Sequence, residues 1–120
     1  MDIYHIWCNL KPGTGDIAFC DKVDAYFGYL RDEGLVVGHR ITRCKLGLAP
    51  KELPEFHIML EVEDMAQLEA AFQRVTSRAG VVEDLHHHVN ELVSDAMFAL
   101  YRDFPDQVRE TGGEKFLEEF

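Results

Sequence analysis

The sequence predicts an α+β domain in which helices cover one face of a four-stranded antiparallel sheet. Residues 2–11 and 56–63 alternate apolar and polar residues, the period of a strand, and residues 35–46 and 95–104 are read as two further strands. Apolar residues at helical spacing separate the first strand from the second and the third from the fourth. The order is therefore strand, helix, strand, strand, helix, strand. With right-handed crossovers this order gives a ferredoxin-like βαββαβ arrangement, with the first and third strands at the centre of the sheet.

The first strand and first helix follow directly from these periods. Between Asp2 and Lys11, one side of the strand carries Tyr4, Ile6, Cys8 and Leu10, and the other carries Ile3, His5, Trp7 and Asn9. The helix that follows buries Cys20, Val23, Phe27 and Leu30. Thr14 or Asp16 is expected to be its N-cap, and Gly34 is expected to end it.

The second and third strands are predicted at residues 35–46 and 56–63. Gly38 is a potential bulge, so it leaves open which face carries His39 and Arg43. The third strand alternates most clearly: Phe56, Ile58, Leu60 and Val62 form an apolar face that must meet the helices, opposite His57, Met59, Glu61 and Glu63.

The second half of the domain starts with Asp64 and Gln67, which resemble a capping box. The apolar stripe of the helix that follows is Leu68, Ala71, Phe72 and Val75, and Gly80 ends or kinks it. A short third helix is predicted at 82–92, and its apolar stripe is Val82, Leu85, Val89 and Leu92. The fourth strand, 95–104, stops at Pro105. The domain is expected to span residues 1–106, followed by an acidic tail at 107–120 in which Phe116, Leu117 and Phe120 need a neighbour for docking.

Composition narrows the class of protein. A chain of 120 residues can bury one core, and its formal charge of −10 argues against nucleic acid as a partner. The sequence has neither a signal peptide nor an apolar stretch long enough to cross a membrane, so we expect a cytoplasmic protein without a membrane partner. Cys8, Cys20 and Cys44 are widely spaced and are expected to be reduced thiols.

The second face of the predicted sheet has no helix to cover it. It carries Ile3, Trp7 and Met59, and soluble monomers rarely leave such an apolar patch in water. A second copy related by a two-fold axis would close two sheets into a barrel with an interior cavity. We therefore expect a homodimer through this face and a hydrophobic small molecule inside it.

Three segments, "MDIYHIWCNLKPG", "EFHIMLEVEDMAQLE" and "FALYRDFPD", resemble a small bacterial family of uncharacterised proteins. The architecture is similar to the dimeric α/β-barrel superfamily, over about the first 106 residues. That superfamily contains cofactor-independent monooxygenases, lactone isomerases, haem-dependent chlorite dismutase-like enzymes and members without known activity. The resemblance implies a homodimer with a pocket on the sheet face. It transfers no catalytic residue, because no superfamily-wide motif is present to map.

The candidate site lies on the two central strands. His5, His57 and Glu61 are the candidate catalytic residues, and Trp7, Asn9, Met59 and Tyr101 are expected to contact the ligand. Three registers remain open: one sets His5 opposite Glu61, one sets it opposite Met59 with Trp7 opposite His57, and one opposes the two histidines. The first gives a His–carboxylate pair that moves protons near neutral pH, and the last gives the start of a metal site.

Metal catalysis is the weaker interpretation. His57 and Glu61 lie four residues apart on one strand, about 13 Å between Cα atoms, so one ion cannot easily bind both. We predict no metal and no cofactor. The sequence favours a binding protein with an apolar, histidine-lined cavity, and the alternative is a monooxygenase- or isomerase-like enzyme in which His5 or His57 transfers a proton. A third interpretation is that the dimer interface fills this face and leaves no cavity.

The run "LHHHV" at residues 85–89 invites a metal site, but its geometry opposes one. Adjacent helical residues point about 100° apart, so His86, His87 and His88 cannot converge on one ion. His87 is expected at the surface in line with Glu83 and Glu91, where weak helix pairing occurs. His86 and His88 flank the buried stripe.

Overall fold

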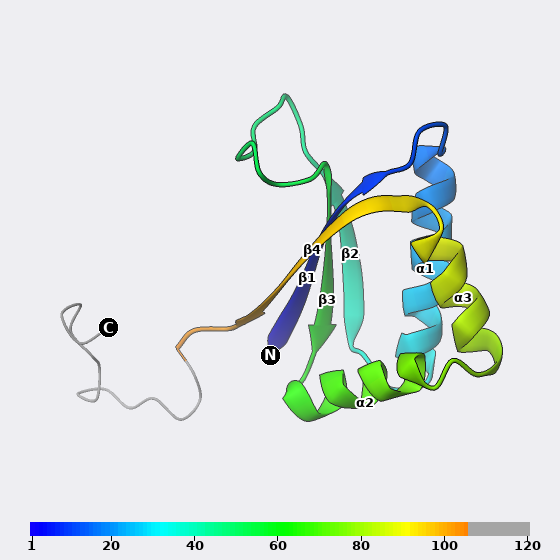
Figure 1. Cartoon of the computed structure of the whole chain (residues 1–120). Coiled ribbons are helices and arrows are strands. Elements are labelled where there is room, and N and C mark those ends of the chain that lie inside the picture. Colours follow the sequence, from blue (N-terminus) through cyan, green and yellow to red (C-terminus); the bar gives the residue numbers. More distant parts are fainter. Residues whose placement is uncertain (106–120) are drawn as a thin grey trace.

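The structure is a computed structural model that describes residues 1–105, and it confirms the predicted ferredoxin-like fold (Figure 1). In chain order the elements are β1 (Asp2–Leu10), α1 (Asp16–Asp32), β2 (Gly38–Arg43), β3 (Phe56–Val62), α2 (Met65–Thr76), α3 (Gly80–Asn90) and β4 (Val93–Arg102). The four strands form one antiparallel sheet in the order β2-β3-β1-β4, with β1 and β3 central as expected. The predicted tail at 107–120 lies outside the described residues.

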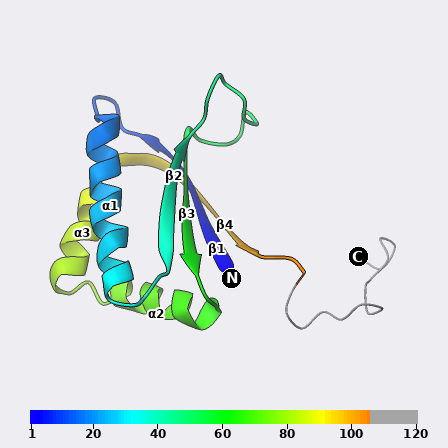
Figure 2. The same ribbon diagram turned by 180° about the vertical axis from the view of Figure 1, so that it is seen from behind.

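All three helices lie on one face of the sheet, as Figure 2 shows from behind. The core is formed between this face and the helices. It contains alternate residues of β3, the inner stripe of α1, one or two residues each of β1, α2 and α3, and one residue before β2: Cys8, Phe19, Val23, Tyr26, Phe27, Leu30, Val36, Phe56, Ile58, Leu60, Val62, Leu68, Ala71 and Val82. The opposite face of the sheet, which we call the open face, is covered by none of the helices within residues 1–105.

Two predictions for α1 were wrong in detail. Its N-cap is Gly15, which has no side chain to cap the helix, and neither Thr14 nor Asp16 takes that position. The Asp16 carboxylate instead accepts a hydrogen bond from the backbone N–H of Ile17 at 2.7 Å. The buried stripe uses Phe19 in place of the partly exposed Cys20. Gly34, with φ of 73°, follows the helix end as predicted, because a glycine tolerates this left-handed conformation.

The predicted cap of α2 is confirmed. The Asp64 carboxylate accepts a hydrogen bond from the backbone N–H of Gln67 at 2.9 Å, which satisfies one of the free donors at the helix start. Positive φ angles occur at Arg78 (50°), after the end of α2, and at Gly80 (62°), the first residue of α3. The backbone therefore changes direction between two short helices.

Strand β2 is shorter than predicted and has no bulge at Gly38, which pairs regularly with Glu61. The register places His39 and Arg43 on the helix face, so neither approaches the open face. His39 lies 2.7 Å from the Asp24 carboxylate of α1, and the Arg43 guanidinium bonds Asp16 at 2.9 Å. Both side chains attach the edge strand to the first helix.

Strand β4 pairs with β1 along its length, but the helices leave much of it uncovered. Phe98, on the helix side of β4, is 60 % exposed. At the far end, the Arg102 guanidinium donates two hydrogen bonds to the buried carboxylate of Asp2, at 2.6 and 3.1 Å. Arg102 thus joins β4 to β1. Within residues 1–105, no helix is long and apolar enough to cross a membrane.

Candidate functional site

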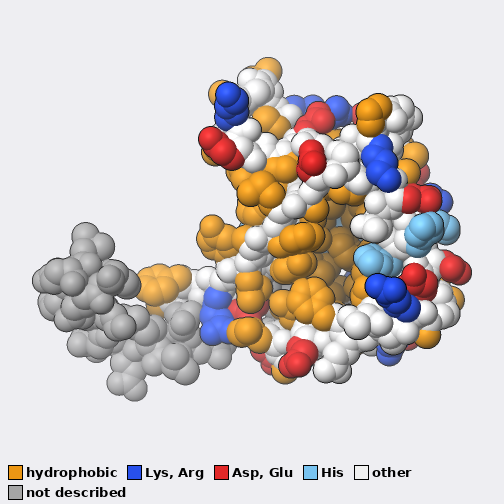
Figure 3. All heavy atoms as spheres, in the orientation of Figure 1, with side chains coloured by type: hydrophobic (Ala, Val, Ile, Leu, Met, Phe, Trp, Pro, Cys, Tyr) orange, Lys and Arg blue, Asp and Glu red, His pale blue; other side chains and the backbone are white. Residues whose placement is uncertain are grey.

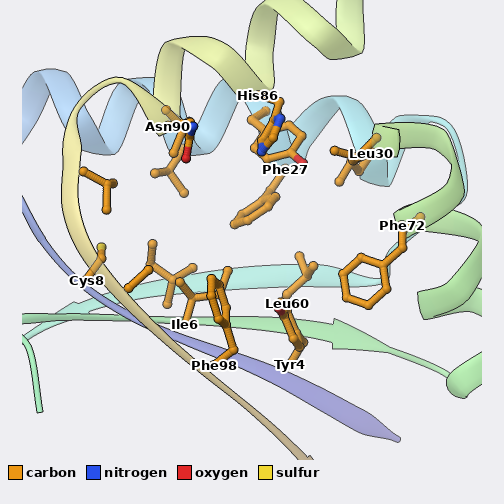
Figure 4. A pocket seen from close by; sticks show the side chains of 18 of the residues that line it. Tyr4, Ile6, Cys8, Phe27, Leu30, Leu60, Phe72, His86, Asn90 and Phe98 are labelled. Carbon is orange, nitrogen blue, oxygen red and sulfur yellow. The ribbon is translucent and has the colours of Figure 1, made fainter. Parts of the chain in front are cut away.

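A pocket of about 300 Å³ lies between the sheet and the helix layer (Figure 4). Its floor consists of inner-face residues of the central strands, including Tyr4, Ile6, Cys8 and Leu60. Phe27 and Leu30 of α1, Phe72 of α2, and His86 and Asn90 of α3 close it from the other side. This volume is at the lower end of the range for small-molecule sites.

The pocket exists because α3 packs on α1 and does not seal the β1–β4 half of the sheet. Figure 3 shows the resulting hollow, with apolar side chains gathered between the sheet and the helices. Tyr4, Phe72 and Phe98 form an aromatic group here: Tyr4 stacks on Phe98 at 5.9 Å and meets Phe72 edge-on at 5.3 Å. Phe72 was predicted to be buried, but it is 45 % exposed beside this hollow.

Few polar groups enter the pocket, and α1 and α3 supply the main ones. Tyr26 is buried, and its ring lies 5.7 Å from the ring of His86. Burial, with a smaller contribution from Tyr4, raises the pKa of Tyr26 to about 12, so its phenol is neutral. Its hydroxyl forms no hydrogen bond with another described residue. Tyr26, His86 and Asn90 therefore offer hydrogen-bonding groups in an otherwise apolar space.

The pocket also contains the thiol of Cys8, which is 1 % exposed. Burial raises the pKa of Cys8 to about 11. The thiolate is the reactive form of cysteine, so Cys8 is an apolar wall residue at neutral pH and not a nucleophile.

The predicted site residues lie on the other side of the sheet, and none of them lines the pocket. The register of β1 and β3 is the second of the three alternatives: His5 is opposite Met59, and Trp7 is opposite His57. Tyr101 of β4 also reaches the open face, where its ring meets His5 edge-on at 4.9 Å. Sequence periodicity thus identified which side chains share this face.

Although the register does not oppose them, the two histidines are in contact. His5 Nδ1 lies 2.9 Å from His57 Nε2, a hydrogen bond across the diagonal of the strand pair. Their ring centroids are 5.1 Å apart with planes inclined by 24°, so the rings meet nearly edge to edge. Trp7 stacks on His57 at 4.5 Å and 11°, and on His5 at 5.6 Å and 15°. The histidine pair therefore rests on one indole.

Two of the predicted residues, the candidate catalytic Glu61 and the candidate ligand-binding Asn9, make no contact with the histidine pair within the described residues. Glu61 lies opposite Ile3 and Gly38, so the His5–Glu61 alternative does not form. The Asn9 amide donates to Asp95 at 3.3 Å, and its oxygen accepts from the backbone N–H of Glu55 at 3.0 Å. Asn9 thus links the end of β1 to β4 and to the residue before β3, whereas Glu61 is exposed.

The histidine run on α3 divides as its helical geometry predicts. His87 is exposed and pairs with Glu91 at 3.4 Å. His86 turns inward and lines the pocket. Among residues 1–105, no three histidine, cysteine or acidic side chains gather into a metal-binding group. Sequence reasoning did not assign His86 to a site, although its position four residues after Val82 and three before Val89 placed it beside the buried stripe.

Comparison with known proteins gives a family but no activity. The model of a family of unknown function, DUF6614, matches residues 1–116. The chain belongs to this family. A search against curated protein sequences found no match.

Solved structures similar to this DUF6614 protein share its fold at low sequence identity. At3g17210 from Arabidopsis thaliana has a TM-score of 0.66 and 6% identity, over 90% of this chain and 100% of that chain. A dimeric ferredoxin-like protein of unknown function from a Jannaschia species has a TM-score of 0.60 and 11% identity, over 86% of this chain and 100% of that chain. SnoaB from Streptomyces nogalater, described as a cofactor-independent oxygenase, has a TM-score of 0.56 and 8% identity, over 90% of this chain and 95% of that chain. At these identities the likeness establishes the fold alone.

Proposed function

We propose that this DUF6614 protein binds a hydrophobic small molecule in the pocket between the sheet and the helix layer. The observation that carries the proposal is the hydroxyl of Tyr26, which forms no hydrogen bond with another residue of the described chain and belongs to a pocket lined by aromatic and aliphatic side chains. A hydroxyl that faces an apolar pocket without a protein partner can donate or accept a hydrogen bond with a ligand there. The ligand is thus apolar with one polar end directed at α1 and α3.

Shape and charge narrow the ligand further. Among residues 1–105, no Lys, Arg, Asp or Glu side chain lines the pocket, so these residues offer no such charged partner to a strongly anionic or cationic ligand. His86 and Asn90 lie together on the α3 wall, as Figure 4 shows. A neutral compound with a hydroxyl, carbonyl or amine at one end matches this distribution of polar groups.

The experiment is a titration with 1-aminoanthracene, a small neutral fluorophore whose emission rises in apolar surroundings. Wild-type protein is expected to bind it saturably at one site per chain. Ala96→Phe enlarges an exposed pocket residue of β4 and is expected to weaken binding at least tenfold. Ala25→Phe adds the same ring on the exposed surface of α1 and is the matched control. Equal affinity in all three proteins would overturn the proposal.

We also propose that two copies associate through the open face. The supporting observations are the exposed apolar side chains there, including Met97 and Tyr101, and the dimeric ferredoxin-like proteins that share the fold. Sedimentation should give a dimer that Met97→Glu weakens. Met65→Glu places the same charge at an exposed methionine of α2 and should leave the dimer intact. A monomeric wild-type protein would contradict this proposal.

A second candidate function is proton-transfer catalysis by His5 or His57, without a cofactor. The specific support is their 2.9 Å contact, in which one nitrogen must be an unprotonated acceptor. Burial lowers the pKa of both histidines, which keeps a basic nitrogen available at neutral pH. This function requires a substrate site inside the dimer barrel, separate from the pocket between sheet and helices.

The proton-transfer candidate is tested by deuterium incorporation. A panel of aromatic ketones is incubated with the protein in deuterated water, and exchange at the carbon next to the carbonyl is followed by NMR. The enzyme hypothesis predicts exchange that His5→Gln and His57→Gln abolish and His87→Gln preserves. Exchange at the buffer rate with every compound would count against it.

A further inference from the structure

The open face contains a side-chain arrangement that neither ligand binding nor dimer formation requires. The His5 and His57 rings meet edge to edge at 2.9 Å and lie flat on the indole of Trp7, and Tyr101 contacts His5 from the side. An N–H···N hydrogen bond between two imidazoles requires that at least one of them is neutral. The charge state of this pair is therefore tied to its geometry.

We propose that the His5–His57 pair makes association of two copies through the open face depend on pH, so that the dimer is strong while both imidazoles are neutral and weakens when they are protonated. This inference rests on the proposed dimer and adds its regulation. Each dimer would enclose two such pairs, one from each copy.

Protonation acts in two steps. A first proton on the donor ring leaves the hydrogen bond in place but puts a positive charge on the pair. A second proton sets two N–H groups head to head at a distance suited to one hydrogen. Either charge must lose water when a partner covers the face, and burial of a charge without a counter-ion is costly. Stacking on Trp7 occurs within one copy and is the same in the monomer and the dimer. It therefore does not decide whether protonation strengthens or weakens the dimer.

Within the described residues 1–105, no carboxylate forms a hydrogen bond or ion pair with either imidazole. The charged open-face residues on the strands are Arg40 of β2, Glu61 of β3 and Asp95 of β4. Arg40 lies opposite Met59, Glu61 lies opposite Ile3, and Asp95 bonds Asn9 at the strand end. The amino group of Met1 pairs with Asp103 at 3.6 Å at the sheet margin. Tyr101 is the remaining titratable neighbour, and its ring meets His5 edge-on at 4.9 Å.

The overall charge of the chain allows the effect of the histidine pair on the dimer to be told apart from the general effect of pH. The chain carries a formal charge of −10 at pH 7 and has a pI near 4.9. Acidification from pH 7.5 to 5.5 therefore reduces repulsion between two copies, and this general effect tightens a dimer. A dimer that weakens over the same range requires a specific group that gains a proton unfavourably in the interface.

The experiment is sedimentation equilibrium at pH 7.5 and pH 5.5. The dimer Kd of the wild-type protein is expected to rise about tenfold on acidification. The double variant His5→Gln/His57→Gln has no imidazole on this face, and its Kd is expected to stay constant or fall. His87→Gln, at an exposed position of α3, is the control and should behave as wild type.

The outcomes separate the two proposals. A wild-type protein that is monomeric at both pH values overturns the dimer and this inference together. A dimer whose Kd is unchanged or lower at pH 5.5 overturns this inference alone. If the double variant does not fold, His5→Phe/His57→Phe is measured in its place, and a tenfold weakening retained in that protein contradicts the assignment to the pair.

Discussion

The imidazoles of His5 and His57 are joined by a 2.9 Å contact although neither lies opposite the other in the sheet. The contact crosses the diagonal between β1 and β3, where aromatic side chains are long enough to meet. A two-dimensional register diagram cannot reveal it, because diagonal contacts depend on the twist of the strands and on side-chain rotamers. Both rings rest on Trp7, the single tryptophan of the chain.

The stacking of Trp7 on His57 predicts a pH-dependent fluorescence signal. Imidazolium quenches indole emission more strongly than imidazole, so emission should fall as the pH decreases. Burial lowers the pKa of His57, with a smaller contribution from the charge of His5, and the midpoint should therefore lie below the ordinary value of 6.5. His57→Gln should flatten the profile. Glu61→Gln should leave it unchanged, since Glu61 is opposite Ile3; a midpoint displaced by this variant would restore Glu61 as a partner of the pair.

Removal of the Tyr26 hydroxyl is expected to separate binding from stability. Tyr26→Phe deletes a group that has no hydrogen bond with another described residue, so the ligand-free protein should keep or slightly raise its Tm. Affinity for 1-aminoanthracene should fall, because the polar end of the ligand loses its partner. Thermal unfolding and fluorescence titration measure the two effects. A large loss of Tm with unchanged affinity would show that the hydroxyl has a structural role only.

The Arg102–Asp2 pair predicts how stability changes in acid. Hydrogen bonds from Arg102 hold the pKa of Asp2 below its ordinary value of 3.8. The pair therefore stabilises the fold fully above that ordinary value, and the contribution is lost as the pH falls through the lowered pKa. Arg102→Leu should reduce the free energy of unfolding at pH 7 and have a smaller effect near pH 2.5, as measured by urea denaturation. Arg31→Leu, which breaks an exposed contact to Asp32, is the control. If Arg102→Leu lowered the free energy of unfolding equally at both pH values, the assignment to the Arg102–Asp2 pair would be contradicted.

The sequence predicted the architecture because local rules and global topology agree. Alternation in β1 and β3 assigned the inner and outer faces correctly, and Asp64 with Gln67 located the start of α2. The prediction for α1 failed at its cap because Asp16 bonds the next backbone N–H and the chain enters the helix through Gly15. Short polar side chains near a helix start have several local partners, and the pattern does not distinguish between them.

The pocket could not be predicted from periodicity. Val82, Leu85 and Val89 mark the inner stripe of α3, but the pattern does not say whether the stripe meets the sheet or another helix. In the structure α3 packs on α1, and the space left over β1 and β4 becomes the pocket. The histidine run therefore contributes one residue, His86, to the pocket. This depends on how α3 packs, which the sequence pattern does not show.

The central claim, that a hydrophobic molecule binds between the sheet and the helices, is tested most directly by a crystal structure with 1-aminoanthracene. We predict electron density for the fluorophore against Phe27 and Tyr26, with its amine directed toward His86 or Asn90. Density confined to the open face around Trp7, or an unfilled pocket at saturating ligand, would contradict the claim.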